Sequence, residues 1–582
     1  MRQLFLIILA VTVLTCRKTD KYNPYNRATP LPYVDAKVIA SIQGIVVDEN
    51  GRPLENAYVH AGAKFMATNA SGNFFFDHVQ TGKNASWVSA EHEGYFKGIR
   101  TFMATDDGVY FVKIQLIPQT VRGRFQTSSG GGANIGNGSE IQIASGNLLY
   151  KYSEVVYTGE VTVTGAYIDP TDPKISSIMP GNLMGLDSIN NLQQLKTYGM
   201  MAIELKSSTG ETLDLPPGKT ATVKFPVPPS MIADAPATIP LWNFDDTTGL
   251  WRKEGFATKE GNMYVGKVAH FSFWNADVPG DFVTLTMKLT NGKGYALPFY
   301  LVKLADIQTG AFSFGTTDSS GTVSGAVPLN AILKLDVYNF CGQIAYSQQI
   351  GPLTRNTDLG NMMLNITGRN PIKISGAVKN CSGAKVNNGF ADIFIDGIYY
   401  RSKVSDGNFS IVINRCTPGN VNAEITATDL DAGQRANTFT AEVGTSDLSL
   451  GNLLACGVTL GQYVNFTISD TIFTGFSDTV DSISSYLYPG FGGGISAFRK
   501  NQPRIRMSSQ LTPNTIPGSN YVHDVYINNG LYNLVGTDGS VYLEETGGRN
   551  EYFLGAISIN MGDSGTSSAR YKVRVNFLVK RY

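Results

Sequence analysis

Short turn signals recur along this chain between runs of alternating apolar and polar residues, and no other sequence feature limits the fold as strongly. At each signal an Asn, Asp or Ser precedes a Gly, at residues 50–51, 71–72, 291–292, 320–321 and 406–407. An Asn-Gly pair between two alternating runs is the strongest short-range hairpin signal, and alternation with a period of two is typical of strands with one buried face. The pattern therefore predicts short strands joined by tight turns.

The composition agrees with this prediction and excludes several other classes of protein. Only 16% of the 582 residues are charged and 62 are Gly, whereas an average soluble domain has roughly 25% charged residues, so coiled coils and long solvated helices are not expected. Lys+Arg and Asp+Glu are equal at 47 each, and a chain with zero net charge and no basic block has no electrostatic footprint for nucleic acid. One short helix is expected, over residues 186–197, because Leu186, Ile189, Leu192 and Leu195 recur at helical spacing.

The first sixteen residues have the pattern of an export signal. A basic start, Met1-Arg2, precedes an apolar run over residues 4–14 that is too short to span a bilayer, and polar, basic residues follow Cys16. The segment resembles a bacterial lipoprotein signal, although Thr15 departs from the small residue that is usual before the cysteine. The resemblance implies lipidation of Cys16 and a lipid-anchored protein of the bacterial outer membrane, facing either the cell surface or the periplasm. An ordinary secretory signal with an incidental cysteine is the alternative.

Strand and turn signals occur in the same order three times, beginning near residues 42, 282 and 374. The stretch from Gly44 to Gly72 is nearly as long as that from Gly376 to Gly407, which indicates a diverged repeat with one sandwich per copy. We therefore expect an all-β protein of tandem Ig-like or transthyretin-like β-sandwich domains. The expected units are a signal peptide (1–15), a tether (16–38), a first sandwich (39–120), a second β-rich region (121–279), two sandwich repeats (280–368 and 369–457) and a C-terminal β domain (458–582).

Two of these units resemble known families. The first carries the residues Gly44, Asp48, Gly51, Pro53, Leu54, Ala57, Val59, Thr68, Gly72, Phe74, Gly94 and Tyr95 in the order typical of the carboxypeptidase regulatory-like domain. That resemblance implies a seven-stranded, transthyretin-like sandwich that serves as a non-catalytic accessory module. The second, with residues 165–170, 179–183, 195–200, 239–245, 248–251 and 270–275, resembles the extracellular segment of astroprincin-type cell-surface proteins, and this resemblance implies no known active site.

Four further cysteines are confined to one part of the chain, at Cys341, Cys381, Cys416 and Cys456. In an exported protein an even set suggests two disulfides, for which three connectivities exist, and buried free thiols are the alternative. Zinc is not expected, because the sequence has no Cys-x-x-Cys pair and no histidine near these cysteines.

The search for catalytic motifs finds no His-Glu-x-x-His, no His-x-x-Glu and no Gly-x-Ser-x-Gly, so the chain is not expected to be an enzyme or to need a cofactor or metal. Trp242, Trp251 and Trp274 fall in one region and are candidates for ligand-binding aromatics, with core packing as the alternative. The expected function is non-catalytic binding or adhesion to a surface protein or a glycan. A hydrolytic enzyme without a sequence signature, or a structural subunit of a cell-surface assembly, is the alternative.

Overall fold

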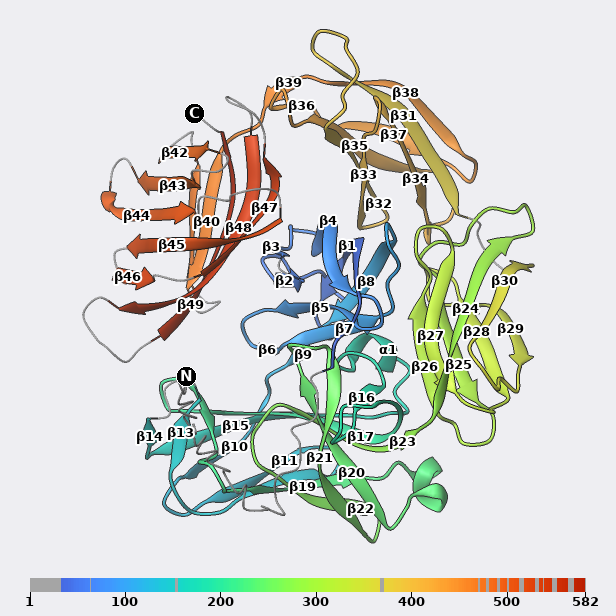
Figure 1. Ribbon diagram of the computed structural model, residues 1–582, viewed down its shortest axis with the longest axis vertical. Helices are drawn as coiled ribbons and strands as arrows, with labels where there is room; N and C mark the ends of the chain where they lie inside the picture. The colour runs from blue at the N-terminus through green and yellow to red at the C-terminus, as the bar shows by residue number, and fades with distance from the viewer. Residues whose placement is uncertain are drawn as a thin grey trace, which may run out of the picture.

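The computed structural model in Figure 1 describes residues 33–62, 64–151, 155–366 and 371–468, and the strands that lie between residues 472 and 580. Strands account for 61% of it and helix for 2%, which confirms the prediction of an all-β protein of tandem domains. The predicted signal peptide, Cys16 and most of the predicted tether lie outside the described residues. Where the chain is described, no helix is both long enough and apolar enough to cross a membrane.

The first sandwich has a three-stranded sheet in the order β4-β1-β8 and a four-stranded sheet in the order β3-β2-β5-β7. The two sheets together have seven strands. Its first and last long strands, β1 and β8, pair in parallel. Apolar side chains from both sheets form one core, among them Val46, Val59 and Ile114. The bounds are β1 (Lys37–Val47), β2 (Tyr58–Ala61), β3 (Lys64–Ala67), β4 (Asn73–Gly82), β5 (Ser86–Glu91), β6 (Tyr95–Phe96), β7 (Gly98–Phe102), β8 (Val109–Gln115) and β9 (Ile117–Pro118).

Two later units repeat this topology. Their three-stranded sheets have the orders β27-β24-β30 and β34-β31-β38, and in each the first and last strands again pair in parallel. The second sandwich consists of β24 (Phe282–Asn291), β25 (Leu301–Asp306), β26 (Phe312–Thr316), β27 (Thr322–Pro328), β28 (Leu333–Tyr338), β29 (Ile344–Ile350) and β30 (Thr357–Leu364). The third consists of β31 (Ile372–Asn380), β32 (Gly389–Ile395), β33 (Ile398–Lys403), β34 (Asn408–Ile413), β35 (Val421–Asp429), β36 (Gln434–Ala436), β37 (Phe439–Val443), β38 (Leu448–Ala455) and β39 (Gly457–Thr459).

The turn after the first strand is built in the same way in all three sandwiches. The side-chain oxygen of Asp48 accepts hydrogen bonds from the backbone N–H groups two and four residues later. Asn291 and Asn380 do the same at the equivalent positions. An Asx side chain that binds the following backbone in this way closes a tight turn, which explains why the motif was readable in the sequence.

A glycine completes each of these units at the second turn. Gly72 and Gly321 have φ angles of 70° and 82°, in the left-handed region that favours glycine. A Cβ atom on either would lie 2.5 Å from a backbone oxygen, that of Val46 or Leu289 respectively. The backbone N–H of the same residue, Val46 or Leu289, donates to the carbonyl of that glycine. The two backbone segments can therefore approach this closely only because glycine has no side chain.

The second β-rich region is one fourteen-stranded sheet with two short helical segments. Its elements are β10 (Val121–Gln126), β11 (Gly131–Gly136), β12 (Ser139–Ile143), β13 (Leu148–Tyr150), β14 (Val156–Tyr157), β15 (Glu160–Ile168), α1 (Ile175–Ile178), β16 (Met184–Leu186), β17 (Leu192–Lys206), β18 (Thr212–Asp214), β19 (Ala221–Pro226), η1 (Pro229–Asp234), β20 (Thr238–Asp245), β21 (Leu250–Glu260), β22 (Met263–Val268) and β23 (Phe273–Gly280).

The predicted helix over residues 186–197 is wrong. Leu186 ends β16 and Leu192 begins β17, and the two strands pair as a hairpin. Asp187 closes the turn between them by accepting the backbone N–H groups of Ile189 and Asn191. Ile189 is 65% exposed, so the helical spacing of the four apolar residues does not mark one buried face.

The first sandwich lies at the centre of the molecule, with the other units around it (Figure 1). Its Phe96 and Ile99 share an apolar core with Trp242 and Trp251 of the second region. Its Phe111 contacts Phe299 and Phe340 of the second sandwich, with ring centroids 5.7 and 5.2 Å apart. Contacts with the third sandwich include Phe75 against Phe390, at 6.3 Å. Because apolar side chains join the units, they form a connected body.

The C-terminal unit is a ten-stranded sheet whose final strand, β49, pairs with β48 and β40. Alternate residues of β49, from Val573 to Val579, are fully buried, as the alternation in the sequence predicts. The strands are β40 (Tyr463–Ile468), β41 (Ile472–Ser477), β42 (Asp481–Tyr488), β43 (Gly492–Arg499), β44 (Gln502–Leu511), β45 (Gly518–Asn528), β46 (Asn533–Gly536), β47 (Gly539–Thr546), β48 (Tyr552–Asp563) and β49 (Arg570–Lys580).

Candidate functional site

The three tryptophans considered as ligand-binding aromatics lie in the core. Trp242, Trp251 and Trp274 are all 0% exposed, so the hypothesis of an aromatic ligand platform is wrong and the core alternative holds. Each indole N–H donates to a main-chain carbonyl, those of Asp277, Asn182 and His270 respectively. A buried indole needs such a partner, because an unpaired donor in the core costs free energy.

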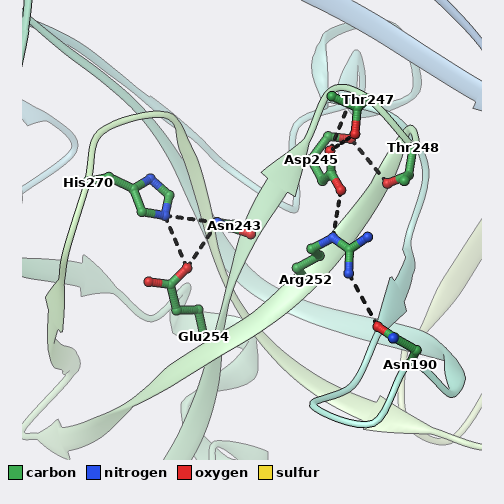
Figure 2. Close-up of polar contacts among 8 residues, drawn as sticks. All are labelled: Asn190, Asn243, Asp245, Thr247, Thr248, Arg252, Glu254 and His270. Atoms are coloured by element: carbon green, nitrogen blue, oxygen red, sulfur yellow. Dashed lines mark hydrogen bonds and ion pairs between the residues drawn. The ribbon is translucent and has the colours of Figure 1, made fainter. Parts of the chain in front are cut away.

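The outer side of the same hairpin is polar. In β20 and β21 the residues that alternate with the buried aromatics are polar and half-buried, and Asn243 and Arg252 are directly opposed across the two strands. With His270 from the connection between β22 and β23, these strands form a polar face that comprises Asn243, Asp245, Arg252, Glu254 and His270 (Figure 2). No sequence motif marked Asn243, Asp245 or His270 as a site.

A three-residue cluster lies at one end of the polar face. His270 Nε2 lies 3.0 Å from Glu254 Oε2 and 2.9 Å from Asn243 Nδ2, which in turn donates to Glu254 Oε2 at 3.0 Å (Figure 2). The hydrogen bond from His270 lowers the pKa of Glu254, although partial burial opposes this shift. Among the described residues no hydroxyl or thiol is hydrogen-bonded to His270.

The other end of the polar face is a turn held by a carboxylate. Asp245 accepts hydrogen bonds from the backbone N–H and the hydroxyl of Thr247, and Arg252 Nε lies 2.6 Å from Asp245 Oδ2. Burial raises the pKa of Asp245, but these hydrogen bonds outweigh it and the pKa is lowered. Arg252 also reaches Asn190 in the β16–β17 turn (Figure 2). The groups therefore bind one another, and they stabilise the hairpin.

A larger feature lies where the second region meets the second sandwich. An open groove of about 700 Å³ is lined by β17 and the end of η1 on one side, and by the β25–β26 turn and the end of β27 on the other. The chain passes from the second region into the second sandwich along this groove, through residues 278–281. Most of its polar lining residues are exposed or half-buried: Lys196, Asp234, Asp281, Gln308, Thr309 and Asn330. Sequence reasoning missed the groove because its walls come from segments that are distant in the chain.

A buried polar network joins β17 and β23, next in the chain to the groove residues Lys196 and Val278. Thr197 Oγ1 donates to Asn275 Oδ1 at 2.8 Å, and Asn275 Nδ2 donates to Asp277 Oδ2. Asp277 is 0% exposed, and its second carboxylate oxygen has no partner among the described residues. Burial raises the pKa of Asp277 well above its ordinary value, against the hydrogen bond from Asn275. Across the described part of the chain no three His, Cys, Asp or Glu side chains gather closely enough to hold a metal ion.

The four cysteines form two disulfides in the structure, in one of the three connectivities left open. Cys341, in the β28–β29 turn, is bonded to Cys416, which follows β34, so this bond joins the second and third sandwiches. Cys381 is bonded to Cys456, and both lie just after the parallel strands β31 and β38 of the third sandwich. Beside the first bond, Asn414 Nδ2 donates to the carbonyl of Pro298 at 2.9 Å, also between the two sandwiches.

Comparisons with known proteins find only partial likeness. No family model matches the chain. It is 33% identical over 107 residues to cartilage intermediate layer protein 2 of Mus musculus, 29% identical over 109 residues to the Homo sapiens protein of that name, and 26% identical over 118 residues to cartilage intermediate layer protein 1 of Mus musculus. The matches cover 18–20% of this chain and 9–10% of those relatives, so the chain spans about a tenth of their length and the likeness does not place it in their family.

Among solved structures, the shaft pilin SpaA of Lactobacillus rhamnosus GG matches 31% of this chain with 99% of its own, at 11% sequence identity and a TM-score of 0.18. The streptococcal ancillary pilin matches 38% of this chain with 95% of its own, at 8% identity and a TM-score of 0.13. Likeness at these scores carries no conclusion about function.

Proposed function

We propose that the protein is a lipoprotein of the bacterial outer membrane, anchored through Cys16, that acts as a non-catalytic binding or adhesion module for a protein or a glycan. Residues 39–120 serve in this proposal as a carboxypeptidase regulatory-like module, and residues 121–279 as an astroprincin-like segment. The observation that carries the binding role is the groove of about 700 Å³ between the second region and the second sandwich. Ligand sites of this size are concave and present a small number of polar groups that fix the ligand's orientation.

The packing around the groove supports a preformed site. Phe312 and Phe314 of the second sandwich pack against the core that holds Trp242 and Trp251. Ala326 packs against Leu186 and Leu250 in a second cluster between the same units. Walls that are fixed before binding lose little conformational freedom when a ligand arrives, which favours affinity.

The binding role is tested by screening the full-length, detergent-extracted protein against glycan and surface-protein arrays, followed by thermal denaturation with each hit. A ligand at a hundred times its dissociation constant stabilises the folded state by about 2.7 kcal/mol. We expect stabilisation and no turnover. If instead a sugar or peptide substrate is turned over, and the double variant Glu254→Gln/His270→Gln of the polar face abolishes that turnover, the protein is a hydrolytic enzyme and the proposal is wrong.

The anchor is tested separately by cell fractionation of wild type and Cys16→Ser. We expect the variant to leave the membrane fraction and to lack a lipid-modified N-terminus by mass spectrometry. Membrane association that is the same in both proteins, with no lipid mass on the wild type, would contradict the lipoprotein role. Purification from native membranes with one partner in fixed stoichiometry would favour a structural subunit of a surface assembly.

A further inference from the structure

Strand β29 of the second sandwich is an edge strand, since it ends the sheet β26-β25-β28-β29 and pairs only with β28 in the described structure. It lies on the side of that sandwich that faces away from the rest of the molecule (Figure 1). Proteins commonly block such an edge with charge, proline, a bulge or a covering segment, because its backbone groups can pair with another strand. β29 contains no charged residue and no Pro. Its one irregularity, at Ala345, leaves residues 346–350 in unbroken register with β28.

The other three edges of the second sandwich are covered or interrupted. β26 packs against the second region through Phe312 and Phe314, and β27 does so through Ala326. β30 carries the exposed Asp358, and a register shift interrupts it at Gly360, whose φ is 64°. Among the described edges of this sandwich, β29 alone lacks these protections.

The corresponding edges of the other two sandwiches are occupied or charged. In the first sandwich β7 ends its sheet as β29 does, and the backbone N–H of Gly181 in the second region donates to the carbonyl of Ile99 in β7 at 2.9 Å. Beside it, the hydroxyl of Thr101 donates to the carbonyl of Gly249 at 2.6 Å. In the third sandwich β37 carries the exposed Glu442. This edge therefore already serves as a docking edge in one copy of the repeat.

We infer that β29 pairs antiparallel with β29 of a second copy of this chain, which joins the two four-stranded sheets into one. A two-fold axis through Gln348, the middle of the regular segment 346–350, places Tyr346 opposite Ile350 in both halves and Ser347 opposite Gln349. Tyr346 and Ile350 already pack on the core of the sandwich, and an aromatic side chain opposite a β-branched one stabilises an antiparallel pair.

Charge does not oppose this pairing. No charged side chain of β29 meets another across the axis, and the formal net charge of the whole chain is zero, so two copies do not repel each other at long range. The contact is small compared with the roughly 1,200–2,000 Å² of a stable interface, so we expect a weak dimer. The inference is independent of the proposed ligand-binding role, which concerns another surface.

The experiment is sedimentation velocity of the full-length, detergent-extracted protein from about 5 μM to about 500 μM, the range in which a weak dimer dissociates. Hydrogen exchange of the peptide that contains residues 346–350 is followed over the same range. The variants Gln348→Lys and Gln348→Glu each place like charges opposite one another at the axis, and Gln348→Glu keeps an acceptor for the hydroxyl of Tyr346. The matched control is Gln142→Lys, an exposed residue of β12, which is paired on both sides.

We expect wild type and Gln142→Lys to dimerise as the concentration rises, with slower exchange in residues 346–350. Gln348→Lys and Gln348→Glu should each raise the dissociation constant about fivefold or more, and an equimolar mixture of the two should dimerise again because opposite charges then meet. Should Gln348→Lys not fold, Gln348→Glu and the exchange of wild type give the same test.

Three results would overturn the inference. One is a wild type that remains monomeric throughout, and another is a dimer that both Gln348 variants leave unchanged. The third is slow exchange of residues 346–350 that is already complete at the lowest concentration, because a segment of the same chain would then occupy the edge.

Discussion

The two disulfides offer a sharp test, because each closes a loop with the same sequence separation of 75 residues. In the chain-entropy account, cross-linking a loop of that length stabilises the folded state by about 4.5 kcal/mol at 25 °C. Any difference between the two bonds in how much they stabilise the fold must then come from their positions in the structure. The loop of Cys381–Cys456 belongs to the third sandwich alone, whereas Cys341–Cys416 spans the second and third.

The perturbation is a pair of double variants, Cys381→Ser/Cys456→Ser and Cys341→Ser/Cys416→Ser, so that no unpaired thiol is left. We expect the first to destabilise the third sandwich by about 4.5 kcal/mol. For a domain of this size that lowers the melting temperature by roughly 20 °C or more. The second should cost the individual sandwich less and should instead separate the unfolding of the two sandwiches, since the disulfide that cross-links them is lost.

The assay is guanidinium unfolding without reductant, followed by hydrogen exchange and mass spectrometry so that each sandwich is observed by its own peptides. The wild type with reductant added to the unfolding buffer should behave like a variant in which all four of these cysteines are replaced by serine. A third sandwich that unfolds at the same guanidinium concentration in Cys381→Ser/Cys456→Ser as in wild type would refute the reasoning. So would thiol labelling of unfolded, unreduced wild type at all four positions.

Three further outcomes follow from the fold. In a urea titration, Gly321→Ala should destabilise the second sandwich by more than about 2 kcal/mol, because the new Cβ meets a backbone oxygen. Gly294→Ala is the control: its φ is 80° but the space around it is open, so it should cost only about 1 kcal/mol. Trp251→Ala should lower the free energy of unfolding by about 3–5 kcal/mol in thermal unfolding. Unchanged stability together with lost ligand binding would contradict the core role of Trp251. Because burial raises the pKa of Asp277 in the folded protein, the unfolded chain ionises first, and wild type should lose stability relative to Asp277→Asn as the pH rises above about 4; parallel pH profiles for the two proteins would contradict this.

The repeated sandwiches could be predicted because their signals are local. Asp48, Asn291 and Asn380 each close a turn with their own backbone, and Gly72 and Gly321 each occupy a position that a Cβ would obstruct. A motif that works through its immediate neighbours is visible in the sequence that contains it.

Features that depend on distant segments were not predictable in this way. The spacing of Leu186 and Leu192 fits a helix as well as it fits two strands joined by a turn. The pairing of β16 with β17 and β21 determines that the strands form. Burial of Trp251 depends on the first sandwich, whose Trp87 contacts Gly249 beside it. The groove brings Gln194, Asp234 and Asp281 together from separate elements, and no local pattern marks that meeting.

The two disulfides also determine how tension passes through this part of the molecule. Because both bonds have the same separation, two covalent routes of equal length connect residue 341 to residue 456, one through residues 341–381 and the other through residues 416–456. Residues 382–415, which carry β32, β33 and β34, lie on neither route. A pull on the chain from both sides is therefore divided between two parallel segments, and the strands between them cannot be drawn out while the bonds are intact.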